Sequence, residues 1–357
     1  MNIEKIQTNT LSALRFPLII GVVFIHSRFT DIITQEGIIS ITGESFPLYS
    51  LLSNLISNVF SRISVPLFFA ISGYFFFYRV NIFNAHVYAN KLKRRLKSLL
   101  IPYIIWNFIV ILILLAAELC IPGMMSGLKK SITEWNITDW FYNLYTVPIS
   151  YQFWFIRDLI LLCIFSPIIY YGIKYGKLPF ILALSILWIF DLWPNIPGFS
   201  IVGIFSFSVG AYFSINQKNF ITILSKNTTI LGSLYVILSI FEVTIVQQQS
   251  WLTYYHNINM IIGMSFLTAL FAKLQIKGYK VENPILTKSS FFIFAYHVMP
   301  LVLILKICFK IIPSYNELSL ICIYLFSTIF IIMVGIGLGT VLEKYFPTFY
   351  KVISGGR

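Results

Sequence analysis

Two ionisable residues share a single apolar run near the start of the chain. Arg15 and His26 are eleven positions apart, in a stretch whose other side chains are mostly apolar. In an α-helix this spacing brings both side chains to within about 20° of one face, about 16 Å apart along the axis. An imidazole accepts a proton near neutral pH, and it can also take up an acyl group as a nucleophile. His26 is therefore a candidate general base or acyl carrier, with Arg15 as its companion in the site.

Both residues also have plainer explanations. Arg15 can be a topology anchor whose long side chain reaches the membrane interface. His26 can form a hydrogen bond between packed helices. Ionisable groups inside membrane helices are costly and mark functional sites, and two of them on one helix face favour the functional interpretation.

Further candidates stand within other apolar runs, near their ends or nearer the middle. They are Arg62, Trp154, Arg157, Asp158 and His297. Adjacent residues point about 100° apart on a helix, so Arg157 and Asp158 should each have a partner on another helix. A structural ion pair explains these two equally well, and an interhelical hydrogen bond explains His297. As functional residues, all five would bind the substrate.

A dense basic run precedes the third apolar run. It contains Lys93, Arg94, Arg95 and Lys97. Basic residues on the cytoplasmic side of a span are expected for topology alone. This run is denser than topology needs, and Lys and Arg also bind phosphates, so it can hold the phosphates of a nucleotide cofactor.

The composition shows that lipid surrounds much of the chain. Of 357 residues, 58% are hydrophobic and 11% are charged, and the mean hydropathy is +0.83. A soluble protein has about half apolar and about a quarter charged residues. The formal net charge is +13, but the basic and aromatic repeats of a nucleic-acid-binding protein are missing, so we expect no nucleic acid partner. The four cysteines lack metal-ligand spacing, and we expect no metal.

Apolar runs of about 20 residues predict an all-α, polytopic membrane helix bundle with about ten transmembrane helices. The runs lie near 11–30, 57–78, 98–118, 152–172, 179–193, 200–214, 229–247, 256–273, 289–309 and 318–342. With the N-terminus in the cytoplasm, 19 of the 26 Lys and Arg residues fall inside and 7 outside, which predicts cytoplasmic N- and C-termini. The longest outer segment, about 119–151, is predicted to lie on the surface as an amphipathic segment.

Neither a repeat nor a change of composition divides the chain. We expect residues 1–357 to form a single membrane-embedded domain, without an extra C-terminal extracytoplasmic domain. The protein would be a multi-pass protein of a plasma membrane, in contact with membrane lipid.

Five blocks of sequence, in order, resemble the acyltransferase family 3 membrane proteins. They are Leu14-Arg15-Phe16-Pro17 with Val23-Phe24-Ile25-His26-Ser27, residues 66–74, the basic run before Leu100-Ile101-Pro102-Tyr103, residues 153–159 and residues 292–297. The resemblance covers nearly the whole chain.

The resemblance implies transfer of an acyl group, usually acetyl, from acyl-CoA to a hydroxyl of a cell-surface carbohydrate or lipid-linked glycan. It implies that Arg15 and His26 are essential and that the inner basic run contacts CoA. The sequence departs from the family in ending soon after its last apolar run, where some members have a hydrolase-like domain, and in having Lys97 where Arg is frequent. A G-x-S-x-G motif is missing, which argues against a serine hydrolase.

These observations combine into one geometric hypothesis. Acetyl-CoA binds with its phosphates at Arg15 and the basic run, and its pantetheine arm, comparable in length to the Arg15–His26 separation, brings the thioester to His26. The acceptor enters from the outer half, near Arg62, Trp154, Arg157 and Asp158.

A transporter of lipid-linked glycans or small molecules is the main alternative, although the inverted repeats typical of transporters are not seen, and a non-catalytic scaffold is another. The sequence leaves open the acceptor, the oligomeric state, and whether transfer is direct or passes through His26.

Overall fold

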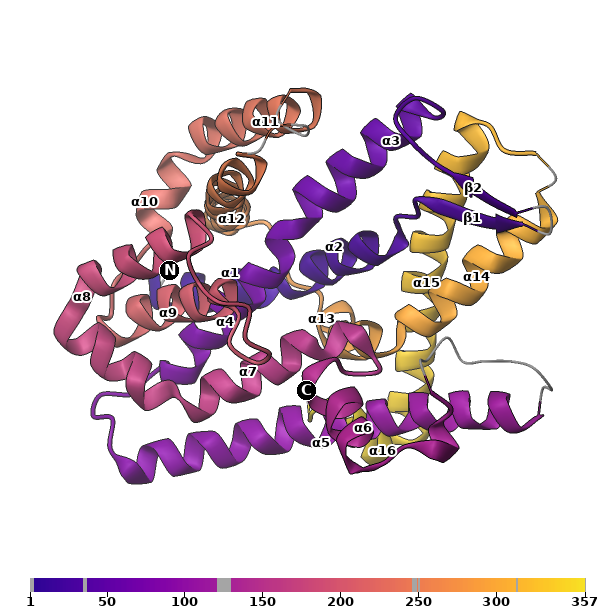
Figure 1. The fold of residues 1–357 in the computed structure, drawn as a ribbon. Coiled ribbons are helices and arrows are strands. Elements are labelled where there is room, and N and C mark those ends of the chain that lie inside the picture. Colours follow the sequence, from indigo (N-terminus) through magenta and orange to yellow (C-terminus); the bar gives the residue numbers. More distant parts are fainter. Residues whose placement is uncertain are drawn as a thin grey trace.

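Apolar runs fold as helices here because lipid offers the backbone no hydrogen-bond partners, so each segment must satisfy its own N–H and C=O groups. The computed structural model describes residues 3–34, 37–120, 130–245, 249, 251–312 and 314–356. Its helices are α1 (Ile3–Ala13), α2 (Arg15–Ser27), α3 (Pro47–Ser53), α4 (Ser64–Phe77), α5 (Ala85–Cys120), α6 (Ile137–Phe141), α7 (Trp154–Ile164), α8 (Ser166–Ile189), α9 (Ile201–Ile215), α10 (Ile221–Lys226), α11 (Thr228–Thr244), α12 (Leu252–Ile276), α13 (Pro284–Tyr296), α14 (Val298–Ile311), α15 (Glu317–Tyr345) and α16 (Pro347–Ile353). The all-α bundle predicted from the sequence is confirmed (Figure 1).

Within the described residues, 6 helical segments are long and apolar enough to cross a membrane, and 8 are if each of two bent pairs counts as one span. The six are Ile3–Ser27, Pro47–Phe77, Ala85–Cys120, Ser166–Ile189, Leu252–Ile276 and Glu317–Tyr345. The bent pairs join α6 and its following turn to α7, and α13 to α14. Two shorter apolar helices, α9 and α11, complete the set. The protein is thus a multi-pass membrane bundle, while the count of ten and the cytoplasmic termini stay predictions.

Helix α8 contains a sharp break. Lys177 has φ 45° and ψ −129°, which no residue of a continuous helix adopts. The break lies between the predicted runs 152–172 and 179–193, and Pro179, which has no N–H to donate, follows it. Two separate segments were predicted here from the sequence, and the backbone breaks between them.

A short hairpin follows α2 that the sequence analysis did not predict. Strands β1 (Asp31–Thr34) and β2 (Gly37–Ser40) pair antiparallel, with Asp31 opposite Ser40. The hydroxyls of Thr30 and Ser40 donate to Asp31, at 2.9 Å and 2.7 Å. These hydrogen bonds favour the carboxylate, and they lower the pKa of Asp31 below its ordinary value.

Helix α2 lies in the middle of the bundle. It packs against α4, α13 and α15, and against a π-helical turn, η1 (Asn54–Phe60), and a 3-10 turn, η2 (Ser61–Ile63), which lead into α4 (Figure 1). Leu14, directly before this helix, and Val23 within it are fully buried. Any side chain on α2 therefore meets residues from several distant parts of the sequence.

Candidate active site

Arg15 and His26 stand at the two ends of α2. The helix runs without interruption from Arg15 to Ser27, so the predicted separation of about 16 Å along one face holds. The two ends of the bundle are named here after these residues, the Arg15 end and the His26 end.

His26 lies beside two aromatic rings from other segments. Its ring centroid is 5.2 Å from that of His297 and 5.0 Å from that of Tyr151, which meets it edge-on. The His26 side chain is half-buried. Among the residues that the structure describes, it has no hydrogen-bond partner, so both ring nitrogens are available to a substrate.

His297 sits at the bend between α13 and α14, which differ in direction by 70°. Pro300 accounts for the bend, because it has no N–H for the carbonyl of Tyr296 and its ring crowds that carbonyl. The Nε2 of Gln152 donates to the neighbouring carbonyl of Ala295 at 3.1 Å. The break thus holds an imidazole at a fixed place inside the bundle.

The tautomer of His297 follows from its hydrogen bonds. Nδ1 lies 2.8 Å from the carbonyl oxygen of Phe294 and 3.1 Å from that of Ile293. Carbonyls only accept, so Nδ1 carries the proton and Nε2 is left as an acceptor. The side chain is 0% exposed, and Nε2 has no hydrogen-bond partner. A buried acceptor without a donor is uncommon and points to a role in chemistry.

The two imidazoles are suited to different tasks. His297 is locked in orientation and presents a lone pair, while His26 is reachable and unbonded. In such a pair, one imidazole can take a proton from a hydroxyl while the other holds it in place. Alternatively, one ring can carry an acyl group while the other acts as base.

The Arg15 end contains a narrow cavity of about 40 Å³. Residues from four of the five sequence blocks line it: Arg15 on α2, Phe68 and Ser72 on α4, Phe155, Ile156 and Leu159 on α7, and Phe294 on α13. The Arg15 guanidinium lies over the Phe75 ring, 5.3 Å from its centroid. Phe294 extends from this cavity to His297, their ring centroids 6.3 Å apart. Phe294 therefore lies between this cavity and the ring of His297.

The basic run lies on α5, and only part of it faces the bundle. Arg95 is half-buried, and its charge acts on Arg15. Lys93, Arg94 and Lys97 are exposed. The structure thus brings Arg95 towards Arg15 and leaves the other three on the surface of α5.

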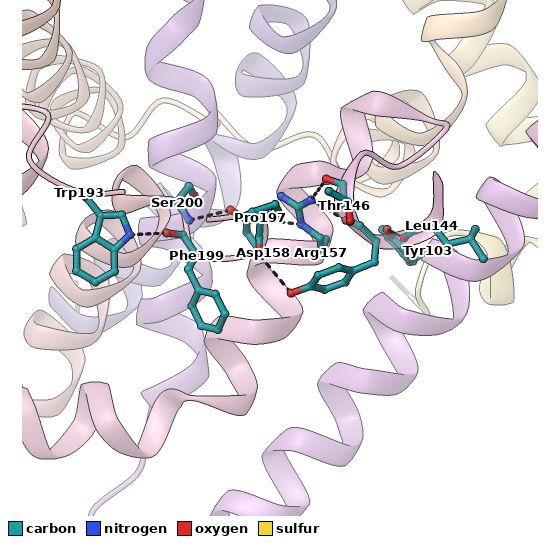
Figure 2. Close-up of polar contacts among 10 residues, drawn as sticks. Tyr103, Leu144, Thr146, Arg157, Asp158, Trp193, Pro197, Phe199 and Ser200 are labelled. Carbon is teal, nitrogen blue, oxygen red and sulfur yellow. Dashed lines mark hydrogen bonds and ion pairs between the residues drawn. The ribbon is translucent and has the colours of Figure 1, made fainter. Parts of the chain in front are cut away.

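Arg157 and Asp158 form a buried pair with each other (Figure 2). Arg157 Nε and Nη2 donate to Asp158 Oδ1 at 3.0 Å and 2.9 Å. Arg157 Nη1 also donates to the carbonyls of Tyr145 and Thr146, both at 2.7 Å, and Asp158 Oδ2 accepts from Ser200 N–H at 3.2 Å. Each residue thus has a partner outside α7, as predicted, but the two also pair with each other, because the long guanidinium folds back to its neighbour.

These contacts tie two chain segments to α7. Tyr145 also donates its hydroxyl to the carbonyl of Pro197, and Trp193 Nε1 donates to that of Phe199 (Figure 2). The predicted surface segment 119–151 is therefore anchored to α7 through Tyr145 and Thr146, and residues 121–129 lie outside the described residues. The donors and acceptors of the pair are largely used internally, which gives Arg157 and Asp158 a structural role. Their substrate binding stays a prediction.

The two remaining predicted residues lie apart. Trp154 is half-buried and packs near Phe69 of α4, with ring centroids 6.3 Å apart. Arg62 lines a cavity at the His26 end together with Arg28 and His256, and its charge acts on His26.

Sequence reasoning missed several residues around His26. Tyr151 and Gln152 come directly before the block 153–159, and the sequence analysis does not name them. Glu242, 4% exposed on α11, was not considered, although a carboxylate in an apolar run is itself a signal. In the described part of the chain, no group of three or more His, Cys, Asp or Glu side chains is arranged to hold a metal ion.

The fold and these residues define a polytopic helical membrane protein with a paired-histidine site. A family model described as an acyltransferase domain matches residues 9–337, so the chain belongs to this acyltransferase family, as the sequence resemblance indicated. The succinoglycan biosynthesis protein ExoH of Rhizobium meliloti (strain 1021) is 25% identical over 223 residues, which are 58% of this chain and 54% of that protein. The chain thus spans about half the length of the curated relative it matches. No solved structure matches it.

Proposed function

We propose that the protein is a membrane O-acyltransferase that moves an acyl group, preferentially acetyl, from acyl-CoA to a hydroxyl of a cell-envelope or exported carbohydrate. The observation that carries the proposal is the contact between His26, which is free, and His297, whose Nε2 is a fixed acceptor. Family membership supports acyl transfer. The name of the ExoH protein, which refers to succinoglycan biosynthesis, supports a carbohydrate acceptor.

The chemistry balances along either of two routes. In direct transfer, the acceptor oxygen attacks the thioester carbonyl, its proton passes to His26, and the C–S bond breaks to release CoA as a thiolate, which is then protonated. In the relay, a ring nitrogen of His26 attacks first and the thiolate leaves. The acceptor hydroxyl then displaces the acyl group from His26, while His297 Nε2 takes its proton. The pair of histidines supplies a base for each step.

We propose that the donor binds at the Arg15 end. The phosphates of acyl-CoA would be bound by Arg15 and Arg95, with Lys93, Arg94 and Lys97 adding charge at the surface. The pantetheine arm would run through the cavity beside Arg15. With a volume of about 40 Å³, this cavity must widen, and rotation of Phe68 and Phe294 would open it.

The remaining parts of the proposal concern location and acceptor. We place the Arg15 end at the cytoplasmic face of a plasma membrane, with both termini in the cytoplasm, because most Lys and Arg residues then lie inside. The His26 end would face outwards and receive the carbohydrate or lipid-linked glycan.

A transporter of lipid-linked glycans or small molecules is the alternative that the sequence leaves open. A helix broken inside the bundle, as at His297, is also found in transporters. A transporter would move its substrate without consuming acyl-CoA. Membership of the acyltransferase family favours acyl transfer over transport.

The decisive experiment compares surface glycans by mass spectrometry in the wild type, a deletion strain, and the deletion strain expressing His26→Ala. The matched control is His86→Ala, because His86 is exposed and bonds only to Asn90, at 2.9 Å. We expect the acyl groups to be lost in the deletion strain and with His26→Ala, and restored by wild type and His86→Ala. Full acylation with His26→Ala would refute the assignment of His26.

A further inference from the structure

A second cavity, of about 360 Å³, opens at the His26 end. It lies between the end of α2, the turns η1 and η2, and helices α11 and α12. Its polar lining comprises Arg28, Asn54, Asn58, Arg62, Glu242 and His256. Arg28 directly follows the end of α2 that carries His26, so the cavity lies at the same end of the bundle as the paired histidines. It is large enough for one or two sugar rings, in the size range of small-ligand sites.

The carboxylate that lines this cavity, Glu242, is hydrogen-bonded to two side chains of α12. His256 Nδ1 lies 2.6 Å from Glu242 Oε1, and Asn259 Nδ2 donates to Oε2 at 2.8 Å. Both oxygens of Glu242 thus have partners from α12. Glu242 orients His256 and forms no ion pair with Arg28 or Arg62.

Neither Arg28 nor Arg62 is paired with a carboxylate in the described residues. Neither forms an ion pair or hydrogen bond there, and Arg28 Nε is buried without an acceptor. Both side chains line this one cavity, and the positive charge of Arg28 acts on Arg62. Two unpaired guanidiniums held together in a protein cavity repel each other, and an anion between them would relieve the repulsion and form bidentate hydrogen bonds.

Two amide side chains add polar groups for a sugar. Asn58 Nδ2 donates to Asn54 Oδ1 at 2.7 Å, one π-helical turn apart. The Asn58 oxygen and the Asn54 amide N–H groups remain for hydroxyls. A wide π-helical turn is frequent at functional sites, and here it brings both amides to the cavity wall.

We propose that this cavity binds a negatively charged group of the acceptor, through Arg28 and Arg62, and so places a neighbouring sugar hydroxyl beside His26. The anion is a carboxylate of an acidic sugar or a diphosphate that links the glycan to a lipid carrier. This inference rests on the proposed function, because it names the class of acceptor for the same site.

The test measures binding without acyl transfer. The purified protein is placed in nanodiscs of zwitterionic phosphatidylcholine, and calorimetry is performed with four probes. They form two matched pairs. The first pair is a glucuronate-bearing oligosaccharide and the same oligosaccharide with its carboxyl reduced to an alcohol. The second pair is a short-chain polyprenyl diphosphate and the corresponding polyprenyl alcohol. The variants are Arg28→Gln, Arg62→Gln and the charge-conserving Arg62→Lys. Arg79→Gln serves as the control, since Arg79 is exposed and pairs with Glu4.

We expect one anionic probe to bind at least about tenfold more tightly than its uncharged counterpart, as charged hydrogen bonds imply. Arg28→Gln and Arg62→Gln should remove this preference, Arg62→Lys should keep part of it, and Arg79→Gln should leave it unchanged. Preference for the glucuronate probe assigns the anion to the sugar, and preference for the diphosphate assigns it to the carrier. The proposal is overturned if charged and uncharged probes bind equally well, or if no probe binds. It is also overturned if Arg79→Gln reduces the preference for the anionic probe as much as Arg28→Gln and Arg62→Gln do.

Acyl transfer is measured separately, in the surface-glycan experiment. A failure of the acceptor inference can therefore be distinguished from a failure of the proposed function. If acylation depends on His26 while probe binding ignores charge, the inference about the acceptor fails and the proposed function stands. If acylation does not depend on His26, the assignment of the catalytic centre fails whatever the probes do.

Discussion

His26 on α2 and His297 at the bend after α13 hold their imidazole centroids 5.2 Å apart. The carbonyls of Phe294 and Ile293 fix the His297 ring with Nε2 as an acceptor. The bend thus sets both the position and the tautomer of the ring beside His26. We infer that the two histidines act together, and their separate tasks can be tested by substitution.

His297→Asn separates the structural role of His297 from its chemical role. An Asn side-chain amide can still donate to the carbonyl of Phe294, as Nδ1 does now, but it places no acceptor where Nε2 lies. We expect a normally folded protein whose acyl transfer is about 10²–10⁴-fold slower, the usual contribution of a general base. Transfer is measured with purified protein, with His86→Asn as the control, and thermal unfolding reports folding. A fully active His297→Asn enzyme would leave His297 a structural role alone.

Tyr151 should position His26 through its ring. The contact is edge-on with centroids 5.0 Å apart, and such aromatic contacts are worth about 0.5–1.5 kcal/mol. Tyr151→Ala should therefore slow transfer about 3–10-fold, whereas Tyr151→Phe, which keeps the ring, should behave like the wild type. The measurement is kcat and KM for transfer to a soluble acceptor. Equal losses in the two variants would mean that the hydroxyl itself takes part.

Arg95 should contribute more to donor binding than its neighbours. It is half-buried and acts on Arg15, whereas Lys93 is exposed. Arg95→Gln should raise KM for acetyl-CoA about tenfold or more, the loss of a charged hydrogen bond, with little change in kcat. Lys93→Gln should have a small effect that disappears at high salt, as expected of a screened surface charge. Equal effects of both variants would indicate that the run attracts CoA only by its overall charge.

The positions of the helices and part of the site could be predicted from the sequence. Apolar runs located the spanning segments, since lipid leaves the backbone no alternative to helix. The shared face of Arg15 and His26 follows from helix geometry alone, and α2 is an uninterrupted helix. These are local properties, which one segment determines by itself.

Contacts between distant segments could not be predicted from these local properties. Nothing local places His297 next to His26, because the contact depends on the bend at Pro300 and on how α13 packs against α2. The Glu242–His256 pair joins two helices in the same way. The self-pairing of Arg157 and Asp158 could not be seen either, because helix geometry gives the direction of the Cβ atoms and not the path of a long, flexible guanidinium.

The Arg157–Asp158 pair should matter for stability more than for substrate binding. Asp158→Asn leaves the Arg157 charge buried without its partner, and breaking a buried pair in this way costs about 3–5 kcal/mol. The exposed pair Lys288–Glu343 is the matched control, and Lys288→Met should cost less than about 1 kcal/mol. The readouts are thermal unfolding in detergent and KM for the acceptor per folded molecule. A raised acceptor KM with unchanged stability would instead assign the pair to the substrate.

The close packing of α4 against α9 should be required for the site to form. A Cβ at Gly210 would collide with the backbone carbonyl of Ala70, and a Cβ at Gly73 with that of Phe207. Membrane helices associate largely through van der Waals contact, which small residues allow by close backbone approach. Because α4 also carries Phe68 and Ser72 to the cavity beside Arg15, Gly210→Ala should lower both the melting temperature and acyl transfer.

Gly337→Ala on α15 is the control, since nothing lies within 4 Å of its added Cβ, and alanine there should stabilise the helix by up to about 1 kcal/mol. Similar stability of the two variants would show that α4 and α9 do not approach so closely, and that the cavity beside Arg15 is formed without this contact.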